Sequence, residues 1–475
     1  MAMIWSIGWK NVWRNKARSL VVIVAVILGI FGGVMATGIM QGWIVQRLHD
    51  GIHNETSHIQ IHHPDFINNE EIQYTIREYD TVACILDTTP EIIAWSPRVQ
   101  LFAMMQSDWA ATGTMLYGVD PVQEKLVSEI HLNIVEGQYF DDDYRMPSMV
   151  ISSKTAENLK LLNYQVTEEK LDSLLTMEFP KDLIKKVESI GKKRFRTEKD
   201  FRKALKNALG QKQFKEYGNT LVDLFSFYRI RSKVTVTLQN KDGRIVYATF
   251  RVRGIYKTHN SLFDGMSVFV RKDDLKAYTN LADNEVHEIA VLCTDKETGT
   301  RVAKRLSGLI PGNSVLSWRE LTPELAMYTD FSNIMGLIYV GIILFALAFG
   351  IINTMLMSVL ERVKELGMLM AVGMNKKRVF QMIMLESVFL TLTGALIGLV
   401  VSGITIEILS HTGINFGVWA EGFEAIGYAA IVYPVVTTGN YISMLLLVII
   451  TGIIASVWPA RKALKLNPVE ALRTD

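Results

Sequence analysis

Four long apolar runs, one near the amino terminus and three in the last third of the chain, constrain the fold more than any other feature of this sequence. Lys, Arg, Asp and Glu are missing from 19–46, 331–360 and 425–460, and the run 380–406 contains only Glu386. A helix of ~20 apolar residues crosses the ~30 Å hydrocarbon core of a bilayer. The first run is too long for a cleavable signal peptide. We therefore predict four transmembrane helices in a 1+3 arrangement, at 19–46, 331–358, 379–409 and 440–459.

Lys and Arg are concentrated in short segments beside these runs, on one side of the predicted membrane. They occur within 10–18, 362–378 and 461–473, whereas 411–440 has none. Because an excess of Lys and Arg marks cytoplasmic segments, we place 1–18, 359–378 and 460–475 in the cytoplasm, and 47–330 and 410–439 outside. Trp5, Trp9 and Trp13 recur every four residues, which predicts an amphipathic amino-terminal segment on the inner leaflet.

The outer region 47–330 alternates strand-like and helix-like segments, which predicts an α+β domain. Strands are expected in HIQIHH, WSPRVQLFAMM, GTMLYGVD, KVTVTLQ, YATFRVRGIY, MSVFVR, EIAVLCTD and SVLSW, with a hairpin at Asp242-Gly243 and a helix at 296–309. The segment 154–230 is expected to be a helical insertion. Its centre, 181–216, holds 13 Lys and Arg against 5 Asp and Glu. A solvated subdomain, anionic lipid headgroups and an acidic protein partner are the alternatives for this charge.

No residue constellation in the outer region predicts catalysis or a metal site. His58 and His62 would stand ~13 Å apart on a strand, too far to share one ion. His49 and His53 have helical spacing, but two ligands are weak evidence, so we predict no metal. Cys84 and Cys293 are predicted to be either two buried free thiols or one disulfide. No Walker-type phosphate loop, nucleophile elbow or HExxH motif occurs, so the chain is predicted not to be an enzyme.

Small residues recur every fourth position in two of the apolar runs. Gly29 and Gly33 mark one face of the first run, and Gly394 and Gly398 mark one face of the third. Such faces let helices approach closely, either within the chain or between subunits. Glu386 and Glu407 are predicted to be interfacial or partner-bound carboxylates, because each lies near one end of its run.

The segment between the second and third runs has the pattern of a helix, a stop and a second helix. Few helix breakers occur from Met355 to Val372, so we expect the second membrane helix to continue through this segment. Gly373 offers a stop and Asn375 a cap. Glu361 and Glu365, with Lys364 and Met368, share one helical face and repel each other slightly. The face predicts either a solvated helix end or contact with a basic groove on a partner.

Three segments resemble the FtsX-like, or MacB/LolC/LolE-type, family of ABC-transporter permeases. LERVKELGMLMAVGMNKKRVFQMIMLES resembles the family's cytoplasmic E-R-x-x-E-[IL]-G element, WPARKALKLNPVEALR resembles its closing motif, and WKNVWRNKARSL resembles its amino-terminal W-x-N-[LV]-x-R motif. IMQGWIVQRLHDGIHNETSHIQIHHP most resembles the lipoprotein-release permeases of this family. The segment 154–230 departs from the family's usual pattern.

The resemblance implies a MacB-like periplasmic core, a Gram-negative inner membrane and a non-catalytic permease. Its partners would be a cytoplasmic ABC ATPase dimer that holds ATP and Mg, a second permease subunit and membrane lipid, and nucleic acid is not expected. Lipoprotein release to a periplasmic carrier is the implied function. A MacB-like exporter of peptides or small molecules and an FtsX-like regulator of cell-wall hydrolases are the alternatives. The implied ATPase-coupling residues are Glu361, Arg362, Glu365, Leu366, Gly367, Ala371 and Gly373, and the tail motif comprises Pro459, Ala460, Arg461, Pro468, Ala471, Leu472 and Arg473.

Overall fold

The structure of the chain is a computed structural model, which describes residues 1–475 except 1–8, 10–11, 15, 141–145, 177–178 and 465–475. The chain forms two compact units. The helical unit comprises residues 1–47, 324–420 and 429–475, and the α+β unit comprises 48–323 and 421–428. The tail residues Pro468, Ala471, Leu472 and Arg473, and Trp5 of the amphipathic segment, lie outside the described residues.

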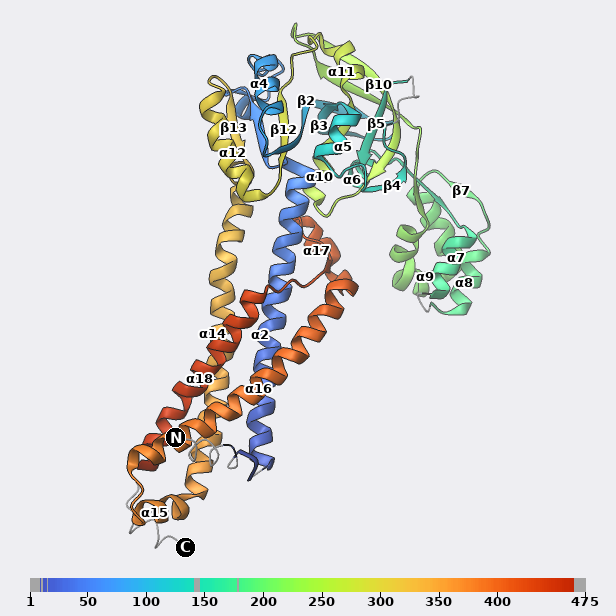
Figure 1. Cartoon of the computed structure of the whole chain (residues 1–475). Helices are drawn as coiled ribbons and strands as arrows, with labels where there is room; N and C mark the ends of the chain where they lie inside the picture. The colour runs from blue at the N-terminus through green and yellow to red at the C-terminus, as the bar shows by residue number, and fades with distance from the viewer. Residues whose placement is uncertain (1–8, 10–11, 15, 141–145, 177–178, 465–475) are drawn as a thin grey trace. The chain divides into compact units, whose positions relative to one another are not determined.

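Four helices in the described part of the chain are long and apolar enough to cross a membrane. They are α2 (Lys16–Asp50), α14 (Pro323–Glu361), α16 (Lys376–Thr412) and α18 (Thr438–Leu464). Each extends beyond the predicted apolar run, because polar residues at both ends continue the helical hydrogen bonding. α14 begins at Pro323, whose ring is accommodated in a first helical turn. Figure 1 shows α16 and α18 side by side within this unit.

Glycines bring the helices of the helical unit into close contact. A Cβ at Gly394 of α16 would lie 2.7 Å from Val26 Cβ of α2, and one at Gly398 would lie 3.2 Å from Ile27 Cα. Two turns further along α2, a Cβ at Gly33 would lie 2.5 Å from the Met444 methyl of α18. Gly29 faces α14, where its Cβ would touch Leu347 at an ordinary 3.7 Å. These glycines therefore serve helix packing within the chain.

The connection between α16 and α18 has short elements of its own. They are β14 (Ile414–Asn415), η2 (Gly417–Trp419), α17 (Ala420–Ala425) and β15 (Ile431–Val432). In the helical unit this connection is tied to α2. The Val435 N–H donates to the Gly38 carbonyl at 3.1 Å, and the Gln46 amide oxygen accepts from the Tyr433 N–H at 3.0 Å.

The α+β unit is built on a mixed sheet in the order β13-β1-β12-β2-β3-β11-β5-β10-β4, with β9 paired to both β10 and β2. Most neighbours are antiparallel, but β3 and β11, and β5 and β10, run parallel. The strands are β1 (Ile59–His62), β2 (Ile92–Gln106), β3 (Ala111–Val119), β4 (Ile134–Gly137), β5 (Ser148–Ser152), β9 (Lys233–Gln239), β10 (Ile245–Tyr256), β11 (Ser267–Arg271), β12 (Glu288–Cys293) and β13 (Ser314–Ser317). The predicted strands and the β9–β10 hairpin at Gly243 are confirmed.

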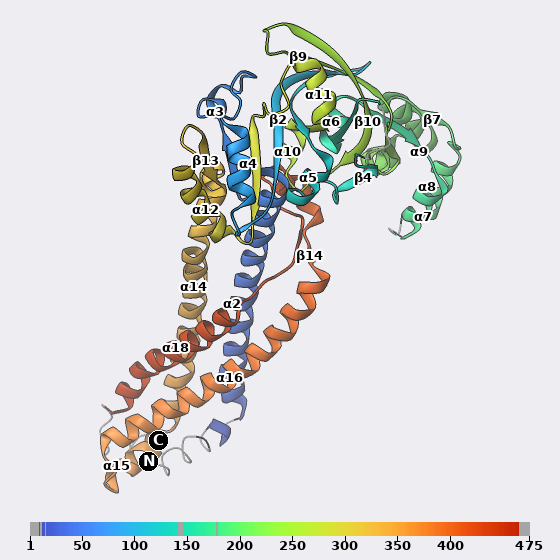
Figure 2. The ribbon, with the colours of Figure 1, turned by 45° about the horizontal axis from the view of Figure 1, so that its top comes forward.

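Helices cover this sheet. Along a strand, successive apolar residues are buried on opposite faces of the sheet. On β5, Met149 and Ile151 join the larger core, whereas Val150 joins a smaller core with Tyr139 and Phe269. This alternation follows from the two-residue period of a strand. The helices are α3 (Phe66–Asn69), α4 (Tyr79–Asp87), α5 (Pro121–Val127), α6 (Ser153–Asn158), α10 (Ser261–Met266), α11 (Lys272–Thr279), α12 (Lys296–Leu309) and α13 (Trp318–Leu321). The predicted helix at 296–309 is confirmed as α12 (Figure 2).

The segment predicted as a helical insertion, 154–230, is a small subdomain with strands as well as helices. It contains β6 (Leu162–Gln165), α7 (Glu168–Thr176), α8 (Lys181–Glu188), β7 (Arg194–Phe195), α9 (Glu198–Leu224) and β8 (Ser226–Tyr228). The three strands form their own sheet, and Phe201, Leu205 and Leu221 belong to a separate apolar core. Residues 154–161 lie outside this subdomain, since Ala156 of α6 and Leu159 directly after it are buried in the core of the main sheet. The prediction also missed the small sheet, because each of its strands is at most four residues long.

The two cysteines are free. Cys293 is buried on β12, and Cys84 on α4 is exposed. The prediction of two buried thiols is therefore correct for Cys293 and wrong for Cys84. Burial raises the pKa of the Cys293 thiol to about 12, so this thiol stays protonated and unreactive near neutral pH.

Asp264 on α10 should make the stability of the α+β unit depend on pH. Its carboxylate is buried and accepts hydrogen bonds from the Thr258 N–H at 3.0 Å and the Thr258 hydroxyl at 2.7 Å. Burial outweighs these bonds and raises the pKa of Asp264 to about 6. Since the folded state keeps a proton that the unfolded chain releases near pH 3.8, the free energy of unfolding should fall as pH rises from about 4 to 6, by about 2–3 kcal/mol.

Asp264→Asn should remove this part of the pH dependence, because the amide carries no titrating proton. Denaturant unfolding of the wild type and the variant at pH 4 and pH 7 measures the difference. Parallel pH profiles for the two proteins would contradict the assignment.

Candidate functional site

The candidate site is the short helix α15 (Val363–Ala371), which lies between α14 and α16 in the helical unit. The expected continuous helix through this segment is wrong, because Arg362 leaves helical geometry at φ −103° and ψ 16° and so separates α14 from α15. Gly373 ends α15 at φ +102°, a left-handed conformation that favours glycine. The Met374 N–H then donates to the Leu369 carbonyl at 2.9 Å, which completes a Schellman-type stop. Asn375 caps α16 through the Lys377 N–H.

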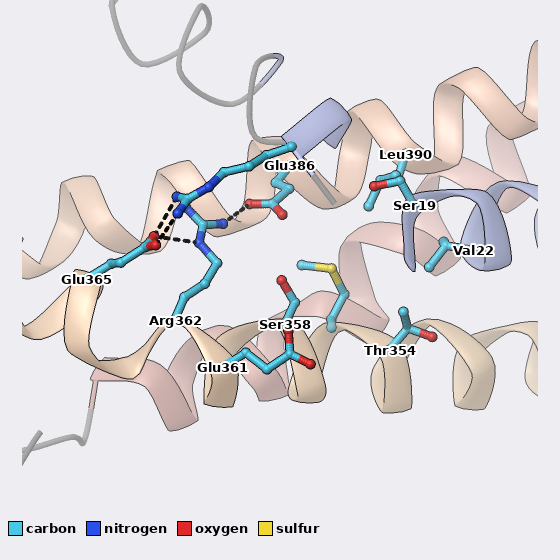
Figure 3. A pocket seen from close by; sticks show the side chains of 11 residues that line it. Ser19, Val22, Thr354, Ser358, Glu361, Arg362, Glu365, Glu386 and Leu390 are labelled. Carbon is cyan, nitrogen blue, oxygen red and sulfur yellow. Dashed lines mark hydrogen bonds and ion pairs between the residues drawn. The ribbon is translucent and has the colours of Figure 1, made fainter. Parts of the chain in front are cut away.

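An ion-pair network joins α15 to the amino-terminal segment and to α16. The Arg14 guanidinium donates to both carboxylate oxygens of Glu365, one of them at 2.8 Å. Arg362 donates through Nε to Glu365 at 3.2 Å and through Nη1 to Glu386 at 2.9 Å. Figure 3 shows the Arg362 guanidinium between the carboxylates of Glu365 and Glu386. The network therefore links three segments that are far apart in the sequence.

Burial differs across the network. The Glu386 side chain is 8 % exposed and that of Arg362 is 18 % exposed, whereas Arg14 is largely in solvent. The Arg14 hydrogen bond, with help from Arg362, lowers the pKa of Glu365, so this carboxylate stays ionised near neutral pH. Glu386 was predicted to be an interfacial or a partner-bound carboxylate, and in the structure it pairs with Arg362 of the same chain.

Of the predicted helical face, Glu361, Lys364 and Met368 are exposed, whereas Glu365 turns toward Arg14 and Arg362. Leu366 and Gly367 are buried. The residues that are exposed instead form what we call the α15 face. They are Glu361, Lys364, Met368, Ala371, Val372 and Gly373.

Two apolar side chains stand out on the α15 face. Met368 is 56 % exposed and Val372 is 85 % exposed. They lie four residues apart and so follow one side of the helix. Lys364 within α15 and the basic run 376–378 that follows it in the chain are exposed as well. An apolar centre with a charged rim is the composition of a protein-docking surface.

A polar cavity of about 210 Å³ lies behind the network, between the ends of the helices. Its lining includes Ser19, Ser358 and Glu361 besides the network residues (Figure 3). Two guanidinium groups, of Arg14 and Arg362, and three carboxylates, of Glu361, Glu365 and Glu386, line this cavity. The ion pairs described above hold the amino-terminal segment, α15 and α16 together.

The described part of the tail motif belongs to α18. Pro459 and Ala460 are buried within the last turns of this helix, and Arg461 is exposed. α18 continues past Pro459 to Leu464, although the predicted membrane segment ended at 459. Near the other end of the chain, Trp9 contacts Trp13, with ring centroids 6.0 Å apart, and Phe389 of α16 at 5.6 Å. Trp9 and Trp13, two of the three tryptophans of the predicted amphipathic segment, are thus neighbours in the structure.

Sequence reasoning missed Arg14 as a site residue. The signal was available in two motifs, since Arg14 is the arginine of the amino-terminal pattern and Glu365 is the second glutamate of the E-R-x-x-E pattern. The residues are 351 positions apart, so their pairing could not be deduced from spacing. Val372 was also missed, because its exposure depends on where Gly373 turns the chain.

Comparisons with known proteins identify the region that contains this site. Residues 337–468 match the family model described as FtsX-like permease C-terminal. The macrolide export ATP-binding/permease protein MacB of Chlorobium luteolum is 37% identical over 126 residues, which are 26% of this chain and 16% of that protein. The uncharacterized ABC transporter permease YknZ of Bacillus subtilis is 29% identical over 220 residues, or 45% of this chain and 51% of the relative.

The chain thus spans less than two thirds of the length of these relatives. Among solved structures, the extracellular domain of YknZ matches 55% of this chain with 12% identity and a TM-score of 0.29. The periplasmic region of MacB from Actinobacillus actinomycetemcomitans matches 58% with 9% identity and the same TM-score. The matched family region contains most of α14 and all of α15, α16 and α18. Residues 337–468 therefore match an FtsX-like permease domain, and parts of this chain are similar to the MacB and YknZ ABC permeases.

Proposed function

We propose that this chain is the membrane permease subunit of an ATP-binding-cassette complex of the MacB/FtsX type. The observation that carries the proposal is the FtsX-like permease domain at 337–468, in which a short exposed helix connects two apolar helices. In the proposed topology, both termini and α15 are cytoplasmic, because Lys and Arg gather there. The α+β unit is then periplasmic, and the membrane is a bacterial inner membrane.

In this proposal, the α15 face contacts a separate cytoplasmic ATPase dimer. ATP and Mg bind to that partner, and this chain has no catalytic role of its own. A second permease subunit, identical or related, completes the complex. Motion of the ATPase pushes α15, and the Arg14–Glu365 and Arg362–Glu386 pairs carry this motion to the amino-terminal segment and α16. The coupling residues implied by the resemblance act here in two ways, since some face the partner and others hold α15 in place.

Two classes of cargo are proposed for the complex. Lipoprotein release to a periplasmic carrier follows from the resemblance to the lipoprotein-release permeases, and a cavity of about 410 Å³ in the helical unit supports it. This cavity is lined largely by apolar residues of α2, α14 and α18, among them Val34, Leu337 and Met444, which suit an acyl chain. The identity with MacB supports export of a peptide or small molecule equally well.

Charge placed at the centre of the α15 face should uncouple the ATPase. Met368→Glu and Val372→Glu are expected to lower permease-stimulated ATP hydrolysis at least tenfold, because a carboxylate would have to be desolvated in the docked apolar centre. The measurement is ATP hydrolysis by the complex purified with its native ATPase and reconstituted in lipid.

The matched control is Val418→Glu. Val418 is also an exposed apolar residue, at 90 %, but it follows the opposite end of α16, which at 37 residues is about 55 Å long. ATP hydrolysis by the complex with Val418→Glu should equal that of the wild-type complex. Purification of this chain without any ATPase, or full stimulation by both α15 variants, would reject the proposal.

Depletion of the chain in its native host distinguishes the cargo classes. Retention of lipoproteins in the inner membrane supports lipoprotein release, and loss of resistance to exported compounds with normal lipoprotein sorting supports a MacB-like exporter. Normal sorting and export with failed cell separation would instead support the FtsX-like regulatory function. The three outcomes are read from membrane fractionation, growth with the compounds and microscopy.

A further inference from the structure

Two histidines and a glutamate meet in the α+β unit outside the site described above. His49 lies at the end of α2, His53 lies in the π-helical turn η1 (Gly51–Thr56), and Glu129 lies in the turn after α5. One ligand atom from each side chain lies within 4.8 Å of the other two. His49 Nε2 is 3.2 Å from Glu129 Oε2, and His53 Nδ1 is 3.6 Å from Glu129 Oε1.

The backbone holds these side chains together. The Glu129 N–H donates to the His53 carbonyl at 2.9 Å, and the Asn133 amide donates to the Asn54 side chain at 2.9 Å. The turn 128–133 is thus joined to η1 on both sides of the cluster. π-helical turns are uncommon and occur frequently at functional sites. Here the turn sets the His49 and His53 rings 4.2 Å apart between centroids.

The separations match the edges of a metal coordination sphere. Zinc binds imidazole nitrogen at about 2.0–2.1 Å and carboxylate oxygen at about 2.0–2.2 Å in tetrahedral sites, so neighbouring ligand atoms lie about 3.3–3.5 Å apart. The two histidine–glutamate distances, 3.2 and 3.6 Å, are close to this value but reach different oxygens of the carboxylate. An ion between the two histidines would therefore be bound by both oxygens, or by one oxygen after a small rotation of the carboxylate. Two histidines and one glutamate also form one of the usual zinc ligand sets, in which water takes the fourth position.

Ion pairing among the three side chains explains their arrangement less completely than a bound metal ion does. One carboxylate neutralises one imidazolium, and a second imidazolium 4.2 Å from the first would be repelled. A divalent ion instead takes both imidazoles in their neutral form and the carboxylate in its charged form. The side chains of His49, His53 and Glu129 are 50, 26 and 36 % exposed, so an ion and its water have access from solvent.

We propose that His49, His53 and Glu129 bind one divalent transition-metal ion of the zinc class, with water at the remaining position. The ion would join η1 to the turn 128–133 and so stabilise the α+β unit at this point. The prediction of no metal site considered only the two histidines at this place, because Glu129 lies 80 positions after His49 in the chain. The proposal does not depend on the permease function.

Zinc binding to the full chain tests the proposal. The protein is purified in detergent without a histidine tag, stripped with chelator and titrated with Zn²⁺, and the bound metal is counted by mass spectrometry. We expect about one tightly bound ion per chain and, with Co²⁺, the visible absorption of a tetrahedral site. Glu129→Gln should weaken Zn²⁺ binding at least tenfold, and His49→Ala with His53→Ala should abolish it.

The matched control is His411→Ala. His411 lies 3.4 Å from Glu407 at the same four-residue spacing, but no second histidine joins this exposed pair, so its loss should leave Zn²⁺ binding unchanged. Zinc should also raise the unfolding temperature of the wild type but not of Glu129→Gln. If Glu129→Gln does not fold, the half-exposed His49→Gln replaces it. A wild type that takes up no zinc at micromolar concentration, or variants that bind like the wild type, would overturn the proposal.

Discussion

Arg98→Met is expected to lower the free energy of unfolding of the α+β unit by about 3–5 kcal/mol, because it leaves two buried carboxylates without their shared cation. Arg98 of β2 is 3 % exposed and lies between Glu124 of α5 and Glu288 of β12, both of which are also buried. Its guanidinium donates to Glu124 at 2.7 and 3.1 Å and to Glu288 at 2.6 Å. Denaturant unfolding of the full chain in detergent, followed by proteolysis of the α+β unit, measures the change.

Two control variants distinguish the effect of leaving buried charges unpaired from the effect of losing an arginine side chain. Arg305→Met removes a bidentate pair with Glu91 that is exposed at the surface, and its unfolding transition should not shift measurably. Arg98→Met combined with Glu124→Gln and Glu288→Gln removes all three charges and should recover part of the lost stability. Equal destabilisation by Arg98→Met and Arg305→Met would show that burial of the charges is not the cause.

Gly394→Val should separate α2 from α16 in the helical unit and cost about 2–3 kcal/mol through overpacking. A Cβ at this position would lie 2.7 Å from Val26 Cβ and 3.0 Å from the Ile23 carbonyl oxygen, and neither atom can rotate away. The helices must therefore move apart, which forfeits the contacts along their whole interface. Retention of folded protein during titration with a denaturing detergent measures the effect.

Gly403→Val is the matched control, since Gly403 lies in the same helix and its Cβ would meet nothing within 4 Å. Its folded fraction should follow that of the wild type. Val26→Gly should partly rescue Gly394→Val, because it removes the nearer of the two obstructing atoms. Loss of stability in Gly403→Val to the same extent would mean that added bulk anywhere in α16 is harmful, independently of packing against α2.

Much of the fold could be predicted because its signals are local. The length of an apolar run identifies a membrane-length helix, and alternating residues identified β9 at the bounds that it has in the structure. The glycine stop at 373 and the Asn375 cap were predictable for the same reason. The break at Arg362 was not, because it depends on Arg362 reaching Glu386 on another helix.

The candidate site shows the limit of local signals more clearly. Glu361 and Glu365 share a face by spacing, and both line the cavity beside the network. Glu365 pairs with Arg14 and Arg362, and Met368 and Val372 are the exposed apolar pair. The motif identified the segment that forms α15, and the ATPase-coupling roles that the resemblance implies for its residues stay predictions. The structure adds that Leu366 and Gly367 are buried.

The sequence by itself determined the four apolar helices, their unequal distribution and most strands of the sheet, since each depends on the period or length of a continuous segment. Only the tertiary structure decided how the charges pair and what they hold. Arg14 meets Glu365 across 351 positions, and His49 meets Glu129 across 80. The physical reason is that an ion pair or a ligand set requires its atoms within a few ångströms, and this proximity is created by packing of the whole chain rather than by any local pattern.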